Sequence, residues 1–300
     1  MGNLRRTKKM IYDCFIFFNE LDLLEVRLNI LNDVVDRFVL VEATKTHSNK
    51  SKPLHFEKNK TRFSKFMHKI EHIIVDDYPP YEDSWTFENY QRNCIERGLK
   101  NCQPDDIILI SDCDEIPNPK TIIENKHISG IKVLEQNLYY YYLNYINQNE
   151  PIWRLGTKML TYKDFLHGLD EVELPDEAYL KRKLNQGTTA TKIRFVQGAI
   201  LKNGGWHFSY LGGAKKIQEK IKAFSHQEFN KRKITNIKNI ENAIASGGDL
   251  YGRDYKFKIV ELDNTFPEYI LENQDKYSHL IFSPENLIKK QKKPYLFFLK

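Results

Sequence analysis

The sequence lacks the features that mark disulfide-rich, zinc-binding and membrane-spanning proteins. Its 300 residues contain only four cysteines, with neither the paired spacing of a zinc site nor a disulfide framework. The apolar run Ile11–Phe18 is too short to span a bilayer, and the basic segment before it has no apolar signal-peptide core. We therefore expect free thiols, no transmembrane segment and a soluble cytoplasmic protein.

The charge balance does not favour nucleic acid as a partner. The formal net charge is +6, which favours an anionic ligand but is too small to indicate nucleic-acid binding. Four lysines within residues 289–293 allow weak contact with an anionic membrane surface, although a solvated charged tail explains them as well. Repeats, low-complexity stretches and linkers are also missing. We expect one domain over residues 1–300, with halves at about 10–118 and 119–285 and a basic tail at 286–300.

Strand-like and helix-like patterns alternate in the first half. Leucines at helical spacing over residues 21–31, with Asn19 as the expected N-cap, predict a helix, and a second helix is expected over residues 86–99. Such alternation predicts an α/β fold with a mostly parallel central sheet flanked by helices. The second half is expected to be mixed, with strands in 130–145 and 193–201 and helices over 214–229 and 237–245. The strands expected in the first half are Ile11–Phe18, Phe38–Val41, His72–Val75 and Asp106–Ile110.

Parallel sheets bind ligands beyond the carboxyl ends of their strands. Asn19, Glu20 and Glu42 fall at two of these predicted ends, and the run Ser111–Pro117 follows a third. On an extended backbone Asp112 and Asp114 would point the same way. Oxygen ligands favour Mg²⁺ or Mn²⁺, which can hold the diphosphate of a nucleotide-sugar. A solvated acidic turn before a proline is the alternative.

Three other side chains are candidates for the same site. His207 follows two glycines and is a candidate third metal ligand, or else a hydrogen-bonded core histidine. Arg92 suits a phosphate, or an ion pair with Glu88 four residues earlier. Lys220 is a phosphate ligand or an ordinary solvated lysine. The tyrosines of residues 139–145 suggest a sugar-stacking platform, although half of them are expected to fill the core.

Several segments together resemble glycosyltransferase family 17, the bisecting N-acetylglucosaminyltransferase type. The resemblance spans roughly residues 11 to 282. It implies a GT-A-like fold and inverting, β1,4-linked transfer of N-acetylglucosamine from UDP-N-acetylglucosamine to a mannose-containing glycan, with Asp112 and Asp114 as the Asp-x-Asp motif. Animal members carry a membrane anchor and process N-glycans in the Golgi, whereas we expect no anchor in this sequence. The segments are Tyr12–Phe15, Phe18–Leu28, Val34–Glu42, Lys52–Leu54, Gln91-Arg92, Ser111–Pro117, Gly205–Ser209 and Phe266–Ile270.

An inverting transfer also needs a carboxylate base near the acceptor hydroxyl. With Asp112 and Asp114 assigned to the metal, the candidates in the second half are Asp164, Asp170, Glu171 and Glu228, and the loop at Asp170-Glu171 is favoured. We therefore expect a metal-dependent glycosyltransferase whose first half binds the donor and whose second half binds the acceptor. A metal-dependent phosphoesterase acting on nucleotide-sugars and a non-catalytic glycan-binding protein are the alternatives.

Overall fold

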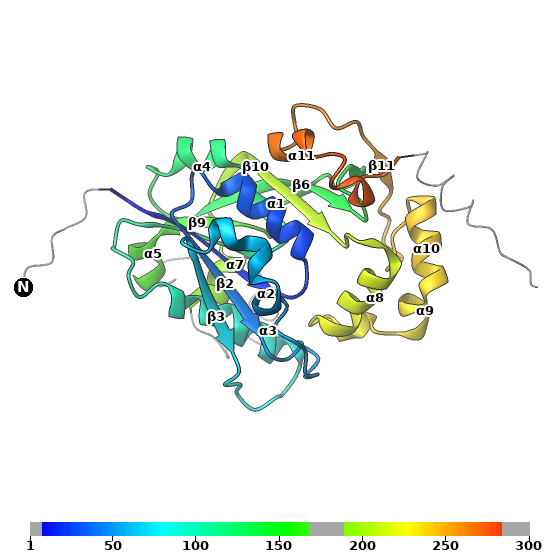
Figure 1. Cartoon of the computed structure of the whole chain (residues 1–300), viewed down its shortest axis with the longest axis horizontal. Helices are drawn as coiled ribbons and strands as arrows, with labels where there is room; N and C mark the ends of the chain where they lie inside the picture. Colours follow the sequence, from blue (N-terminus) through cyan, green and yellow to red (C-terminus); the bar gives the residue numbers. More distant parts are fainter. Residues whose placement is uncertain (1–7, 168–188, 284–300) are drawn as a thin grey trace, which may run out of the picture.

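The computed structural model describes residues 8–167 and 189–283. These residues form an α/β fold around one mixed sheet of 11 strands (Figure 1). The main path through the sheet runs β11-β7-β6-β9-β4-β1-β2-β3, and β5, β8 and β10 pair beside it. The predicted α/β class is confirmed. All four cysteines are buried, and no disulfide joins them.

The predicted strands of the first half are present and parallel. They are β1 (Ile11–Phe17), β2 (Arg37–Ala43), β3 (Ile70–Val75) and β4 (Ile107–Asp112). Successive residues of these strands enter different cores: Phe15 packs with the α1 side of the sheet and Cys14 with the opposite side. Because both faces are covered, these strands consist of unbroken apolar runs rather than alternating ones.

The helices of this half cover both faces. Helix α1 (Leu21–Leu31) matches its prediction, but Glu20 rather than Asn19 occupies the N-cap position, without a side-chain cap bond. Glu20 Oε2 instead accepts hydrogen bonds from the backbone N–H groups of Phe18 and Asn19. The other helical segments before β4 are α2 (His55–Lys58), η1 (Lys60–Phe66), α3 (Ser84–Asn93) and η2 (Cys94–Gly98).

The second half makes the sheet mixed. Here β10 (Ala199–Ser209) and β6 (Lys132–Tyr140) are parallel, but β9 (Lys158–Thr161) runs antiparallel between β4 and β6. The expectation of a mostly parallel sheet therefore describes β1–β4 and not the whole sheet. The remaining antiparallel strands are β5 (Glu115–Pro117), β7 (Tyr145–Asn147), β8 (Ile152–Trp153) and β11 (Phe257–Ile259).

Two element predictions in the second half were wrong at their boundaries. The expected strand over 193–201 begins only at Ala199, since the residues before it end α7 (Thr189–Phe195), and it continues through both glycines to Ser209. The expected helix over 214–229 is α8 (Gly213–Ala223), which stops because Phe224 is extended. The other helical segments are α4 (Pro119–Asn125), α5 (Tyr162–His167), η3 (Gln227–Phe229), α9 (Arg232–Thr235), α10 (Ile237–Ser246), α11 (Glu268–Glu272) and η4 (Ser278–Leu280).

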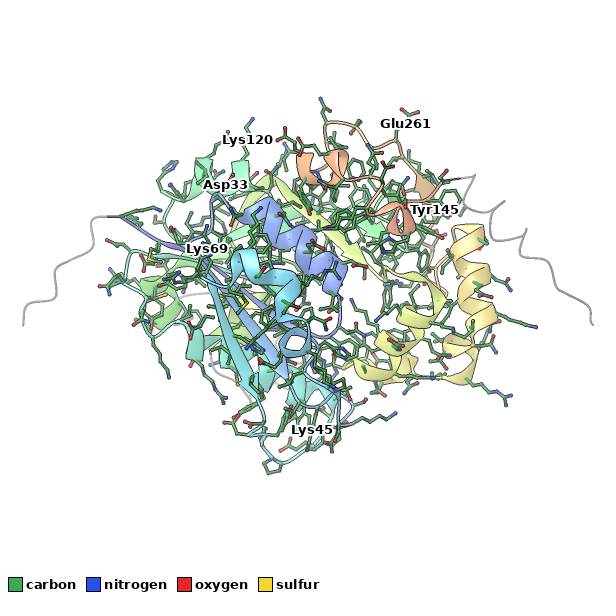
Figure 2. All side chains as sticks on the ribbon, viewed as in Figure 1. Asp33, Lys45, Lys69, Lys120, Tyr145 and Glu261 are labelled. Atoms are coloured by element: carbon green, nitrogen blue, oxygen red, sulfur yellow. The ribbon has the colours of Figure 1, made fainter. Side chains whose placement is uncertain are left out.

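Helices α8, α9 and α10 lie together on one side of the molecule, shown in yellow in Figure 1. Between them and the sheet lies an aromatic core that contains most of the tyrosine run: Tyr140, Tyr141 and Tyr145 are buried with Phe257. Charged side chains such as Lys120 and Glu261 extend from the rim (Figure 2). In the part of the chain described, no helix combines the length and apolarity needed to cross a membrane. The basic tail lies outside the described residues.

Candidate active site

A cavity of about 460 Å³ opens at the carboxyl ends of β1 and β4. From β1 the chain proceeds to β2 and β3 on one side, and it then returns to place β4 on the other side of β1. Crevices at such reversals of strand order are where open α/β sheets bind ligands. The cavity wall combines the acidic loop after β4, the end of β10 and the segment that follows α8.

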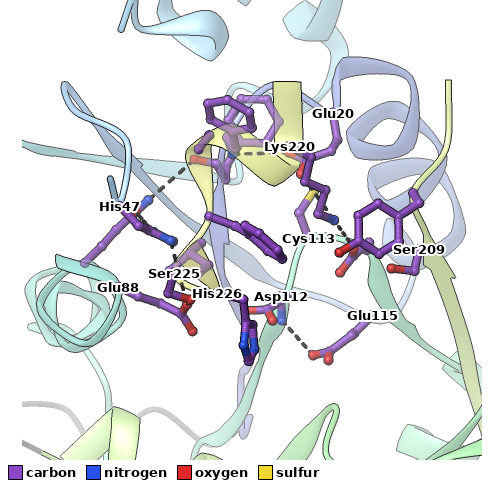
Figure 3. Close-up of a pocket in the computed structure, with 18 of the residues that line it drawn as sticks. Glu20, His47, Glu88, Asp112, Cys113, Glu115, Ser209, Lys220, Ser225 and His226 are labelled. Atoms are coloured by element: carbon purple, nitrogen blue, oxygen red, sulfur yellow. Dashed lines mark hydrogen bonds and ion pairs between the residues drawn. The ribbon is translucent and has the colours of Figure 1, made fainter. Parts of the chain in front are cut away.

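The acidic loop does not have the extended shape expected from the sequence. Strand β4 ends at Asp112, Cys113 and Asp114 form a turn, and β5 begins at Glu115. Because the backbone turns between them, the two aspartates meet different partners. The loop is closed by a hydrogen bond from the Asp112 backbone N–H to Glu115 Oε2 at 2.8 Å, drawn in Figure 3.

A fully buried guanidinium holds this loop from beneath. Arg27 of α1 forms an ion pair with Asp13 of β1, with both side chains inaccessible to solvent. The remaining Arg27 donors bind the Ser111 hydroxyl at 2.6 Å and the carbonyl oxygens of Asp112 and Glu115, both at 2.9 Å. One side chain therefore links β1, α1 and the acidic loop.

Two further arginines surround Asp112. Arg92 Nη1 of α3 lies 2.8 Å from Asp112 Oδ1, and Arg194 Nη2 of α7 donates to Asp112 Oδ2 at 2.8 Å. Arg194 also donates to both oxygens of Glu115, and Arg92 donates to Glu88 at 3.0 Å. Burial opposes ionisation of Glu115, but the Arg194 guanidinium lowers the pKa of that carboxyl to about 2.

Asp114 faces the other side of the loop. Its Oδ2 accepts from the Lys220 ammonium of α8 at 2.6 Å, and its Oδ1 lies 3.7 Å from His207 Nε2 of β10. Burial opposes ionisation, but Lys220 and then His207 hold the pKa of Asp114 well below its usual range. The His207 ring packs against Trp153, whose indole N–H donates to Glu115 Oε1 at 2.9 Å.

The predicted metal ligands only partly converge. Asp114 and His207 are adjacent, buried and on the cavity wall, and carboxylate and imidazole are donors that Mn²⁺ accepts. The buried Nδ1 of His207 has no hydrogen-bond partner. Within residues 8–167 and 189–283, no three His, Cys, Asp or Glu side chains are grouped as a metal site. Asp114 and His207 therefore offer two donors on the cavity wall, whereas Asp112 is engaged by arginines.

The opposite wall is polar and aromatic. His47 Nε2 is hydrogen-bonded to Gln91 at 3.0 Å, and Glu88 accepts from the Ser225 hydroxyl. Figure 3 shows Asp112 between Glu88 on this side and Glu115 on the other. The half-buried rings of Trp85, Phe224, His226, Phe229 and Tyr251 complete this wall. Planar rings beside hydrogen-bonding groups suit a nucleobase or a pyranose.

The other residues that were predicted to bind the nucleotide-sugar donor lie in different places. Glu20 lines the cavity, with Oε1 3.9 Å from Lys220 Nζ, and Asn19 lines a smaller adjoining cavity of about 80 Å³. Arg92 is buried and approaches Asp112 from behind the wall. Glu42 is fully buried and accepts hydrogen bonds from the Phe56 backbone and His72, so it supports the fold beside the cavity rather than its wall.

Two of the four candidates for the base, Asp164 and Glu228, lie in the described part of the chain, and neither lines the cavity. Asp164 exchanges hydrogen bonds with Thr161 at the start of α5. Glu228 is exposed and bonded to His226 Nδ1 at 2.7 Å. His226 lines the cavity, and Glu228 does not. Asp170 and Glu171 lie outside the described residues.

Sequence reasoning missed Arg27 and Arg194. Arg27 carried a usable signal, because it stands among Leu24, Leu28 and Leu31 on the apolar face of α1. A charge at such a position has to be paired. Arg194 carried no such signal, since its partners Asp112 and Glu115 are 82 and 79 residues away in sequence.

Comparison with known proteins defines the class. Residues 2–168 match the model of glycosyltransferase family 17, so the chain belongs to this family, as its motifs predicted. The chain is also similar to the beta-1,4-mannosyl-glycoprotein 4-beta-N-acetylglucosaminyltransferases of Homo sapiens and Rattus norvegicus, each 26% identical over 306 residues. The mouse relative is 25% identical. Each match covers 93% of this chain and 56% of the relative, so the chain spans about half the length of these relatives.

Proposed function

We propose that this chain transfers N-acetylglucosamine from UDP-N-acetylglucosamine to a mannose-containing glycan, with inversion and a β1,4 linkage, on a GT-A type of fold. One observation carries the proposal: a cavity at the β1–β4 switch point combines the acidic loop with cationic side chains from α7 and α8. Family membership and the names of the relatives support the reaction class.

In the proposed reaction the acceptor hydroxyl oxygen bonds to the anomeric carbon of the donor. The bond from that carbon to the diphosphate oxygen breaks, and its electron pair leaves with UDP. Lys220 and Arg194 are cavity-lining cations that contact the acidic loop, and they would attract the negative charge that grows on the leaving diphosphate. A low-dielectric, partly enclosed cavity strengthens this attraction.

We propose a divalent cation, Mn²⁺ or Mg²⁺, at the Asp114–His207 pair, with Asp112 on the same loop. When bound, it would add Lewis-acid neutralisation of the diphosphate. The chain's own part is to keep Asp114 ionised, which the Lys220 ammonium already favours. The hydroxyl proton needs an acceptor on the other face of the sugar, and Asp170 or Glu171 remains our proposal for it.

A donor screen tests this function. The full chain is incubated with a panel of UDP- and GDP-sugars, with and without Mn²⁺, and released nucleoside diphosphate is measured. We expect UDP release from UDP-N-acetylglucosamine, accelerated by a mannose-containing glycan and by Mn²⁺. A preference for GDP-sugars would refute the donor assignment.

The same screen separates the alternatives. A phosphoesterase would release sugar phosphate or UMP instead of intact UDP. A glycan-binding protein would bind glycans in calorimetry without binding UDP. The acidic side chains are paired with two arginines and a lysine. A site that activates water between two metal ions needs more free carboxylate and histidine ligands than this, so the pairing favours a diphosphate-binding site.

A further inference from the structure

Lys52 is a buried lysine of the cavity wall that has no part in the reaction described above. Its side chain is only 6% exposed, and the residue lines the cavity. Its backbone N–H donates to the Thr44 carbonyl oxygen at 2.9 Å, and Pro53 follows it in the chain. Lys52 therefore starts from a fixed backbone position close to the carboxyl end of β2.

The ammonium of Lys52 has few partners for a buried charge. Within the described part of the chain its hydrogen bond goes to the Pro53 carbonyl oxygen and is long, at 3.4 Å. The carboxylate oxygen Glu42 Oε1 is 3.8 Å away, beyond hydrogen-bond length. Burial lowers the pKa of Lys52, and Glu42 and then Glu20 oppose this shift. An ammonium carries three N–H donors, so this one can bind a ligand without giving up a short bond to the protein.

We propose that Lys52 binds the base of the UDP donor, by donating a hydrogen bond to a carbonyl oxygen of uracil. This assignment rests on the proposed function, because it places one part of the donor named there. Lys52 is then a residue that determines nucleotide specificity, and it does not touch the reacting atoms.

The local charge favours a neutral group beside Lys52. Its single positive charge faces two carboxylates, those of Glu42 and Glu20. A diphosphate at this position would bring further negative charge towards both of them. A carbonyl oxygen, by contrast, accepts a hydrogen bond from the ammonium and adds no net charge. The base therefore suits Lys52 better than the diphosphate does.

The neighbouring wall also suits a flat group. Phe18, directly after β1, lines the same cavity, and the Lys52 ammonium lies 5.6 Å from the centre of its ring. An aromatic ring beside a hydrogen-bond donor can contact the plane of a base while the donor reaches its polar edge. Both residues follow the carboxyl ends of parallel strands, where open α/β sheets bind their ligands.

The variant Lys52→Met should fold. Methionine keeps a flexible apolar stem of similar length and removes the ammonium. Glu42 keeps its hydrogen bond from the Phe56 backbone N–H at 3.0 Å and its contact with His72 at 3.1 Å. Lys50→Met is the matched control, because Lys50 belongs to the same loop but is exposed and does not line the cavity. Thermal unfolding verifies that both variants are folded.

The experiment measures dissociation constants by calorimetry, in buffer with Mg²⁺, for UDP, 2-thio-UDP, 4-thio-UDP and inorganic pyrophosphate. Lys52→Met should weaken UDP binding by about tenfold, which corresponds to about 1.4 kcal/mol, and should leave pyrophosphate binding unchanged. Sulfur accepts hydrogen bonds weakly, so one of the two thio analogues should bind wild type about tenfold more weakly than UDP does. That difference should disappear in Lys52→Met. Lys50→Met should behave as wild type throughout.

Donor kinetics provide a second measurement. Lys52→Met should raise KM for UDP-N-acetylglucosamine by about tenfold and keep kcat, because a contact with the base is equally strong before and in the transition state. A fall in kcat at unchanged KM would contradict the assignment.

The outcomes separate this inference from the proposed function. Unchanged UDP affinity in Lys52→Met would overturn the role of Lys52 and leave the proposed function standing. Equal losses of UDP and pyrophosphate affinity would show that Lys52 contacts a phosphate instead, and thio analogues that bind wild type as tightly as UDP would exclude the base carbonyls. A wild-type chain that binds no UDP would overturn the proposed function as well.

Discussion

Replacing Arg27 by methionine should be among the most damaging single changes in this chain. The side chain is inaccessible to solvent, and its partner Asp13 is equally buried. Methionine has a similar length but no charge, so the change leaves the buried Asp13 carboxyl without its counter-ion. Removing one member of a buried ion pair costs about 3–5 kcal/mol.

The lost hydrogen bonds add to this effect. Arg27 also donates to the carbonyl oxygens of Asp112 and Glu115 and to the Ser111 hydroxyl, and each buried group left unsatisfied costs about 1–3 kcal/mol. These costs overlap and do not simply add. Since a domain is typically stable by about 5–15 kcal/mol, we expect a folded protein at low temperature with at least about 3 kcal/mol less stability.

Urea unfolding of wild type, Arg27→Met, Asp13→Leu and the double variant measures the effect. The double variant should recover part of the loss, because it removes the unpaired charge, but not all of it, because the loop carbonyls stay unsatisfied. Arg62→Met is the control: its ion pairs with Asp22 and Glu25 are partly exposed, and its loss should stay below about 1 kcal/mol. A loss of unfolding free energy below about 1 kcal/mol in Arg27→Met would refute the idea that Arg27 holds the acidic loop in place.

Two other predictions concern stability. Burial, with Arg194 as a further cause, lowers the pKa of Lys158 from 10.5 to about 8. Between pH 8 and pH 10.5 the lysine is therefore protonated in the unfolded chain but not in the folded chain, so stability rises with pH across that window. Lys158→Met should therefore stabilise the protein at pH 7 by up to about 3 kcal/mol, since each unit of pKa corresponds to about 1.4 kcal/mol. The variant should lose this advantage above pH 10. Urea unfolding of wild type and Lys158→Met at pH 7 and at pH 10.5 measures the effect, and equal stability of the two proteins at both pH values would contradict the prediction. Gly205 has φ +140°, and a Cβ there would lie 2.1 Å from the Ile116 carbonyl oxygen, so Gly205→Ala should cost about 2–3 kcal/mol in the same assay. Gly252→Ala, at φ +78° with open space around it, is the control at about 1 kcal/mol, and equal losses at both glycines would show that the close approach to β5 is unimportant.

The first half of the fold could be predicted because its signals are local. Strands such as β1 and β2 are apolar runs, and the leucine spacing indicates helix α1, although its N-cap is one residue later than expected. The second half could not be predicted as well, because its pairing is set at long range. Strand β10 runs through Gly204 and Gly205, residues that indicate a turn in the sequence, since these glycines let it pass close to β5 and β6.

The site shows the same division between local and distant information. The acidic loop is contiguous in sequence and was predicted, but its charge partners Arg92, Arg194 and Lys220 come from α3, α7 and α8. Nothing local distinguishes these three among 46 lysines and arginines, and only two of them were named as candidates.

This difference matters for how an Asp-x-Asp motif is interpreted. The residue types alone predict two equivalent metal ligands, because an extended strand would point both aspartates the same way. The chain instead turns at Cys113, so the two carboxylates reach different cations. A carboxylate held by two arginines that are at most 11% exposed is costly to redirect, whereas one held by a single lysine that is 25% exposed costs less. The surroundings of each aspartate in this loop are therefore determined by the distant cation that it meets, and not by its position in the motif.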